Sequence, residues 1–190
     1  AVLNSIQWRK SMKWAEYELS WGRPLKSILA VFSNKNLDFK YHHIESSNFT
    51  FLDKEFESKK KIFKNFKNYS NYLKKNGLII DHNERKDFIK KKLLQYSKNK
   101  NLNLEINEKL LQEVTDLVEQ PKILMCKFDK KFLQIPKEIL TITMQHHQKY
   151  FPTFDNKNVI SNEFFVVANN EDKKGFIKEG NERVVEARLS

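Results

Sequence analysis

The chain of 190 residues has one cysteine, Cys126, only four glycines and no long apolar run. One cysteine rules out an intrachain disulfide, and its apolar neighbours Ile123, Leu124 and Met125 predict a buried, inert thiol. No stretch approaches the ~18 apolar residues of a membrane span, and no charged, apolar and small-residue signal pattern opens the chain. We therefore expect a soluble, cytoplasmic protein with no membrane partner.

Patterns that mark catalytic centres are also missing. The chain contains no Gly-rich phosphate loop, no Gly-x-Ser-x-Gly turn and no adenylate-forming motif. Two double histidines, His42-His43 and His146-His147, are poor metal sites, because adjacent residues face opposite sides of a strand or diverge around a helix. We expect no catalytic residue, no metal site and no cofactor within this chain.

Positive charge is abundant, with 35 Lys and Arg against 24 Asp and Glu and a formal net charge of +11. Such a balance permits binding to a polyanion, because lysine and arginine displace counterions from phosphates. Abundant lysine, asparagine, isoleucine and phenylalanine with little glycine is also the product of an AT-biased genome. Both explanations remain open.

The first part of the chain combines strand and helix patterns. Residues 27–32 and 39–44 predict the two strands of a β-hairpin, with its turn at 33–36. From residue 56 to 75, apolar residues recur at helical spacing, and lysines project on the other side. These lysines form a candidate basic patch or simply a solvated helix face: Lys60, Lys61, Lys64 and Lys75.

The remainder predicts helices interspersed with strands. A helix over 83–98 should bury Ile89, Leu93 and Tyr96, and Asn107 should cap a helix that ends before Pro121. The apolar face of this second helix should comprise Leu110, Val114, Leu117 and Val118. Further on we expect a strand over 122–128, a helix from Pro136 to 147 or 148, strands over 150–154 and 163–168, and a helix capped by Asn181.

This order favours an α+β fold of antiparallel hairpins packed with amphipathic helices, rather than a doubly wound parallel sheet. The composition suggests three parts: a strand-rich part at 1–54, a helical part at 55–120 and an α+β part at 121–190. A single continuous domain is the alternative.

Two long motifs in the last third of the chain identify a family resemblance. Residues 143–152 read TMQHHQKYFP, and residues 179–190 read EGNERVVEARLS. Upstream, SMKW at 11–14, WGRPL at 21–25 and LLQEVTDLVEQP at 110–121 extend the pattern. Together these segments resemble the beta subunit of bacterial heterotetrameric glycyl-tRNA synthetase. A Gly-His-Arg-Phe-type element of that family has no counterpart after residue 45, and we expect the chain to be an internal piece of a longer subunit.

The resemblance implies a role and partners. In that family, glycine activation with ATP belongs to the alpha subunit, and the beta subunit is implicated in tRNA binding and in holding an alpha2beta2 tetramer together. It implies a non-catalytic region of a glycine-tRNA ligase, inactive alone, with the alpha subunit and tRNA as partners. Two alternatives are a purely structural interdomain scaffold and a vestigial editing-type domain resembling that of the phenylalanyl-tRNA synthetase beta subunit.

The motifs also supply candidate contact residues for tRNA or a protein partner. Lysine offers a cation to phosphate and tyrosine a stacking face, although Tyr150 could equally begin a core strand. Arg183 could form an ordinary intrahelical pair with Glu186. We expect the segments around residues 149 and 181 to lie close together, since the intervening hairpin returns the chain to one sheet edge. The candidates are Gln148, Lys149, Tyr150, Asn181, Arg183 and Arg188.

Overall fold

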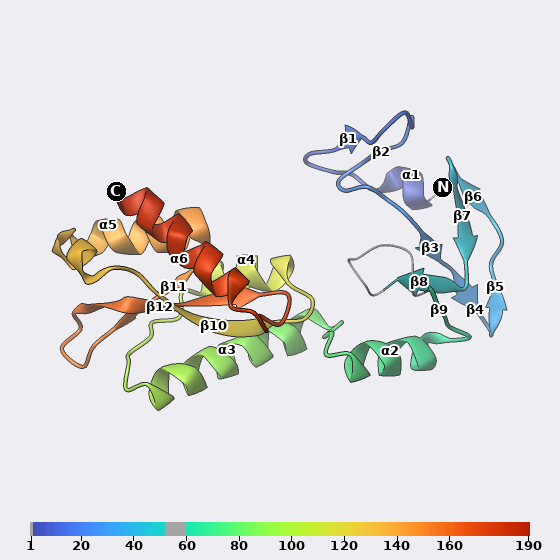
Figure 1. Cartoon of the computed structure of the whole chain (residues 1–190). Coiled ribbons are helices and arrows are strands. Elements are labelled where there is room, and N and C mark those ends of the chain that lie inside the picture. Colours follow the sequence, from blue (N-terminus) through green and yellow to red (C-terminus); the bar gives the residue numbers. More distant parts are fainter. Residues whose placement is uncertain (1, 52–59) are drawn as a thin grey trace. The chain divides into compact units, whose positions relative to one another are not determined.

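A computed structural model describes residues 2–51 and 60–190. The chain divides into two compact units, residues 1–72 and residues 73–190, which are described separately (Figure 1). The chain combines helices with mainly antiparallel strands, so the fold is α+β as the sequence predicts. The predicted boundary between residues 54 and 55 lies outside the described residues. Within the described ranges no helix is long and apolar enough to cross a membrane.

The first unit consists of very short strands. Antiparallel pairs join β1 to β2, β4 to β5, β6 to β7 and β8 to β9, and β3 pairs with β7 in parallel. Leu19, Ile44 and Phe63 are its buried apolar side chains among the described residues. The elements are α1 Val2–Ser5, β1 Met12–Lys13, β2 Ser20–Trp21, β3 Ile28–Leu29, β4 Val31–Phe32, β5 Lys35–Asn36, β6 Lys40–Tyr41, β7 Ile44–Ser47, β8 Phe49–Phe51 and β9 Lys60–Ile62.

The prediction of one hairpin between residues 27–32 and 39–44 is wrong. Each segment instead begins a hairpin of its own, because Val31 pairs with Asn36 and Tyr41 pairs with Ile44. Ser33 and Asn34 both have positive φ, 49° and 61°, the backbone of a two-residue type I′ turn. That tight turn reverses the chain earlier than the sequence pattern indicates.

The predicted helix over 56–75 is also corrected. Residues 60–62 form strand β9, which pairs with Phe49–Phe51, and α2 begins only at Phe66 and ends at Lys75. Residues 56–59 lie outside the described residues. Phe63 is buried ahead of the helix, where its ring contacts Tyr69 and Tyr72. Gly77 follows the helix with a φ of +78°, a left-handed backbone that ends α2.

The second unit is a three-stranded antiparallel sheet between two helical layers. The strand order is β10, β12, β11. Figure 1 shows α5 and α6 on one side of the sheet and α3 on the other. The elements are α3 His82–Asn99, α4 Glu108–Leu117, β10 Lys122–Lys127, the 3-10 helix η1 Lys130–Gln134, α5 Lys137–Ile142, the π-helix η2 Thr143–Gln148, β11 Phe151–Phe154, β12 Ile160–Ala168 and α6 Phe176–Leu189.

Each face of the sheet has its own core. Val185 of α6 and Leu140 of α5 pack against Cys126, Phe128 and Phe164. On the opposite face, side chains of α3 and α4 pack against Phe151 and Phe165, and the buried members from these two helices are Ile89, Leu93, Leu110, Leu111 and Val114. Helical residues before 120 and the strands after 121 therefore share one core.

Local signals placed α3 and α4 correctly. The Asn107 side chain accepts a hydrogen bond from the Leu110 N–H at 3.0 Å, so the predicted cap is confirmed. Two predicted core positions are wrong: Tyr96 is 44% exposed and Leu117 65% exposed. Ser97 is buried in place of Tyr96, and its hydroxyl donates to the Leu102 carbonyl, which lets a small polar side chain close the end of α3.

Candidate functional site

The two family motifs meet in the second unit. Tyr150, immediately before β11, donates its hydroxyl proton to Asn181 Oδ1 of α6. The Asn181 side-chain amide in turn donates to the Ile177 carbonyl at 2.6 Å. Burial raises the pKa of the Tyr150 hydroxyl to about 12, so this group stays a hydrogen-bond donor at neutral pH. The expected proximity of the two motif segments is confirmed.

The start of the last helix differs from the prediction. Asn181 lies inside α6, which begins at Phe176, and so it caps nothing. The capping side chain is Asp172, which accepts from the Ile177 N–H at 3.0 Å and from the Lys178 N–H at 2.8 Å. The sequence pattern pointed to Asn181 because asparagine is a common cap, whereas the left-handed Gly175 lets the helix begin earlier.

Lys149 ends the π-helix in an unusual backbone conformation. Its φ and ψ are 61° and 37°, a left-handed conformation that costs a non-glycine residue about 1 kcal/mol or more. The turn is closed by a hydrogen bond from the Tyr150 N–H to the Met144 carbonyl at 2.9 Å. The Lys149 ammonium forms an ion pair with Glu113 of α4 and holds the pKa of that carboxyl below its usual value.

The other three candidate residues, Arg183, Arg188 and Gln148, differ in their contacts and exposure. Arg183 pairs with Glu179, one turn earlier, and not with Glu186 as expected. Arg188 is exposed near the end of α6, and within the described residues it forms no ion pair. Gln148 is half-buried at the end of η2, beside the exposed His146 and His147. The motif thus leaves only part of its charge available to a partner.

Two carboxylates fix α6 on the sheet through backbone contacts that the sequence did not predict. Glu182 accepts from the Lys127 N–H at 2.8 Å, and Glu186 accepts from the Asp129 N–H at 3.0 Å. Lys127 ends β10, an outer strand of the sheet, so these bonds satisfy outward-facing amides along an edge. The sequence signal that could have predicted this role is their four-residue spacing, which places both glutamates on one helix face.

The candidate basic patch does not lie on a helix face. Lys60 and Lys61 belong to β9, Lys64 follows that strand, and Lys75 is the last residue of α2. The Lys60 ammonium lies 4.8 Å from the centre of the Phe49 ring, and that of Lys61 lies 5.1 Å from the Tyr72 ring. Strand pairing therefore replaces the predicted helical patch with lysines set over aromatic rings.

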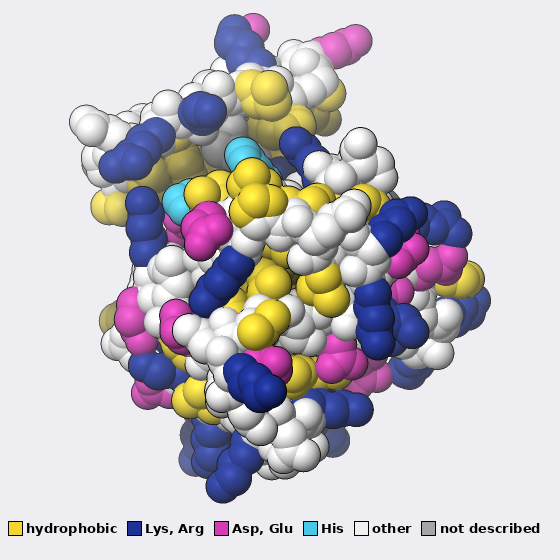
Figure 2. All heavy atoms as spheres, turned by 90° about the vertical axis from the view of Figure 1, so that its left-hand side faces the viewer, with side chains coloured by type: hydrophobic (Ala, Val, Ile, Leu, Met, Phe, Trp, Pro, Cys, Tyr) yellow, Lys and Arg dark blue, Asp and Glu magenta, His cyan; other side chains and the backbone are white. Residues whose placement is uncertain are grey.

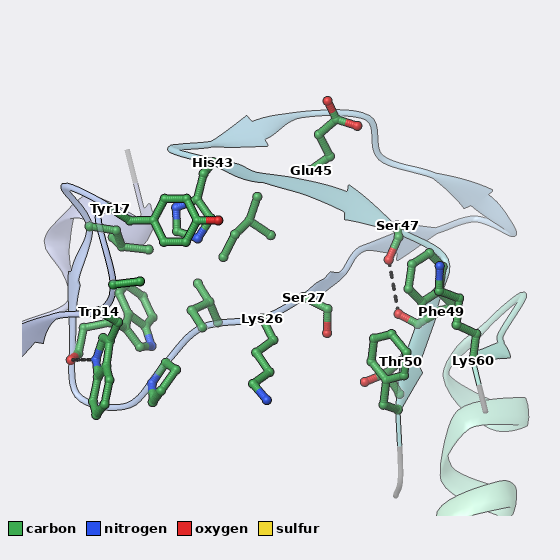
Figure 3. A pocket seen from close by; sticks show the side chains of 17 residues that line it. Trp14, Tyr17, Lys26, Ser27, His43, Glu45, Ser47, Phe49, Thr50 and Lys60 are labelled. Atoms are coloured by element: carbon green, nitrogen blue, oxygen red, sulfur yellow. Dashed lines mark hydrogen bonds between the residues drawn. The ribbon is translucent and has the colours of Figure 1, made fainter. Parts of the chain in front are cut away.

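A cavity of about 1100 Å³ lies within the first unit. Figure 3 shows Trp14, Tyr17 and His43 at one end and Phe49, Thr50 and Lys60 at the other. The Tyr17 and His43 rings are stacked, with centres 3.5 Å apart and planes within 6°. Trp14 donates its indole N–H to the Trp21 carbonyl at 3.2 Å. Sequence reasoning missed this cavity, although both tryptophans stand in the quoted SMKW and WGRPL segments.

Residues 2–51 and 60–190 contain one buried thiol and no cluster of metal-ligating side chains. No group of three His, Cys, Asp or Glu side chains in these ranges is placed to hold a metal ion. Cys126 is fully buried, as predicted, and burial raises the pKa of its thiol to about 12. That thiol is protonated at neutral pH and is a poor nucleophile.

The surface of the second unit carries both signs of charge. On the face shown in Figure 2, Lys and Arg side chains are interspersed with Asp and Glu and with exposed apolar groups. The exposed apolar side chains on α5 and α6 include Ile139, Ile142 and Val184. A mixed surface of this kind is more typical of a protein contact than of a continuous polyanion groove.

Comparison with known proteins agrees with the motifs. A family model described as "Glycyl-tRNA synthetase beta subunit" matches residues 1–190. The glycine–tRNA ligase beta subunit of Rickettsia akari (strain Hartford) is 36% identical over 190 residues, covering 100% of this chain and 29% of the relative. Those of Rickettsia felis (strain ATCC VR-1525 / URRWXCal2) and Rickettsia canadensis (strain McKiel) are 35% and 34% identical, again over 100% of this chain and over 29% and 28% of their own lengths.

A match along the whole chain, with the fold and the joined motifs, defines a region of an aminoacyl-tRNA synthetase subunit. The chain belongs to the glycyl-tRNA synthetase beta subunit family, which confirms the resemblance seen in the sequence. It spans less than a third of the length of these relatives.

Proposed function

We propose that this chain is a non-catalytic region of a glycine-tRNA ligase beta subunit, contributing to tRNA binding and to subunit and domain assembly. Its partners are the alpha subunit of an alpha2beta2 enzyme and tRNA, and ATP is used at the alpha subunit. The complete enzyme works in the cytoplasm.

One observation carries this proposal: the polar groups of the family motifs are used for internal bonds. Tyr150 binds Asn181, and Glu182 and Glu186 bind backbone amides at and just beyond the end of β10. Lys149 and Arg183 are paired with carboxylates of the same unit. A motif used in this way fixes the shape of a surface, which favours a positioning and contact role over a chemical one.

A direct test gives the chain ATP, glycine and labelled pyrophosphate in the absence of alpha subunit. We expect no pyrophosphate exchange above background, because adenylate formation needs motifs that the sequence does not contain. Exchange that persists after further purification would contradict the proposal. Adding alpha subunit together with the complete beta subunit serves as the positive control.

The tRNA-binding role is tested by titrating the chain with tRNA at two salt concentrations. Binding that rests on phosphate contacts weakens steeply with salt. No saturable binding at low salt would leave the scaffold alternative, which the mixed surface of the second unit favours. Release of an amino acid from charged tRNA would instead support the editing-type alternative.

A further inference from the structure

We propose that the aromatic cavity of the first unit binds a short run of unpaired RNA nucleotides, with their bases stacked on its rings. This inference rests on the proposed tRNA-binding function and names the site and the form of RNA that it recognises. The described residues that line the cavity come from 14–51 and from Lys60, far in sequence from the two motifs around Tyr150 and Asn181.

Aromatic rings at both ends of the cavity supply the stacking surfaces. Tyr17 is 48% exposed although it stacks on His43, so much of this ring pair stays accessible. Trp14 and Phe49 also line the cavity. Unpaired bases stack readily on such side chains, and the interaction tolerates any base because every base has a π face.

Lysines accompany the rings, as a phosphate backbone requires. Lys26 and Lys60 both line the cavity, and Lys60 sits over the Phe49 ring at 4.8 Å. In Figure 3 Lys60 lies beside Phe49, and Lys26 extends between the two aromatic ends of the cavity. Residues 1–72 contain 13 Lys and Arg against 7 Asp and Glu, so the unit that holds the cavity is itself positively charged. Such a unit attracts a polyanion.

The concave shape favours a single strand over a duplex. In a duplex the base faces are covered by their neighbours, so rings inside a cavity have nothing to stack on. An unpaired strand can turn its bases inward and leave its phosphates near the lysines. Figure 3 places the Ser27 and Thr50 hydroxyls on the cavity side, where they can hydrogen-bond a ribose 2′-hydroxyl.

The chain carries its own reporter for this site. All three tryptophans, Trp8, Trp14 and Trp21, lie in the first unit, and Trp14 and Trp21 line the cavity. The experiment titrates the chain with an unstructured single-stranded RNA ten nucleotides long, a blunt duplex of the same length, and whole tRNA. We expect saturable quenching of tryptophan fluorescence by the single strand, and binding at least tenfold weaker for the duplex.

Matched variants separate stacking from charge. Tyr17→Ala should weaken single-strand binding about tenfold, and Tyr17→Phe, which keeps the ring, should restore it. Phe32→Ala removes a 70% exposed ring of the same unit that does not line the cavity and should change nothing. Lys26→Gln with Lys60→Gln should reduce the slope of log affinity against log salt by about 0.7 per lysine. Lys35→Gln with Lys40→Gln is the charge-matched control.

The outcomes are separable. Equal losses for Tyr17→Ala and Phe32→Ala, or for the two lysine pairs, would overturn the inference, and so would equal affinity for strand and duplex. If tRNA binds but the cavity variants leave its affinity unchanged, the cavity is excluded while the proposed function stands. A fluorescence change caused by the alpha subunit and not by RNA would also overturn the inference and assign the cavity to a protein contact.

Discussion

At the scale of single residues, side chains that a sequence suggests for recognition are used here for structure. Tyr150 shows this most clearly, since its ring packs in the core against Phe164 and its hydroxyl binds Asn181. From the sequence alone, a tyrosine after Gln148 and Lys149 could be a stacking surface or the start of a core strand. The structure favours the second interpretation, because Tyr150 is buried.

Replacing Tyr150 by phenylalanine tests the cost of that hydrogen bond. We expect Tyr150→Phe to lower the free energy of unfolding by about 1–2 kcal/mol, because the part-buried Asn181 oxygen loses its donor. Urea unfolding of the second unit, followed by circular dichroism, measures the change. Tyr96→Phe is a suitable control, since Tyr96 lies in the same unit and is 44% exposed. Equal effects would contradict the assignment.

Cys126 predicts a dependence of stability on alkaline pH. Burial raises the pKa of its thiol from 9.0 to about 12, so the folded state holds the proton more tightly than the unfolded state. The contribution of this thiol to the free energy of unfolding is fully present below pH 9 and is lost as the pH rises towards 12. At pH 10 the wild type should have lost about 1 kcal/mol relative to pH 8 through this group. In urea unfolding, Cys126→Ala should have a lower free energy of unfolding than the wild type at both pH 8 and pH 10. The decrease between the two pH values should be smaller for the variant. The same pH dependence in both proteins would count against this account.

At the scale of elements, α6 is positioned by two kinds of contact. Val185 packs into the core on the face of the sheet that α6 covers, and Glu182 and Glu186 bind the Lys127 and Asp129 amides at and just beyond the end of the edge strand β10. The helix therefore covers both a face and an edge of the sheet. An exposed edge is a common route to unwanted strand pairing, so this arrangement also protects the molecule from association.

Two glutamates of α6 form a matched pair for testing this docking. Glu182→Ala should destabilise the fold by about 1–2 kcal/mol, because the Lys127 amide loses a charged acceptor. Glu179→Ala removes only the exposed pair with Arg183 and should cost less than about 0.5 kcal/mol. Thermal or urea unfolding compares them. If the two variants lose equal stability, edge docking does not hold α6 in place.

The elements also show what sequence reasoning can reach. Helices α3 and α4 were predictable because caps and apolar periodicity are local signals, and Asn107 caps α4 where the sequence placed it. The short strands around Val31 and Lys60 were not, because a two- or three-residue strand is defined by its partner and not by its own composition. The cavity escaped notice for the same reason: Trp14, Tyr17, His43 and Phe49 come together only through those pairings.

At the scale of the whole molecule, the two units differ in how much core they bury. Within the described residues, the first unit buries three apolar side chains, Leu19, Ile44 and Phe63, whereas the second has a separate core on each face of its sheet. Because hydrophobic burial is the main stabilising contribution, the first unit should be the less stable of the two. The proposed binding cavity lies in that weaker unit.

This difference predicts unfolding in two separate transitions. All three tryptophans report on the first unit, while α3, α4, α5 and α6 place most of the helical signal in the second. In urea, tryptophan fluorescence should change at a lower midpoint than circular dichroism at helical wavelengths.

Single-stranded RNA at a concentration 100 times its Kd should stabilise the first transition by about 2.7 kcal/mol and leave the midpoint of the second unchanged. Coincident midpoints would mean that the units unfold together. A shift of both transitions by RNA would place its binding across the whole chain and not in the cavity, because a ligand stabilises only the unit whose folded state it binds.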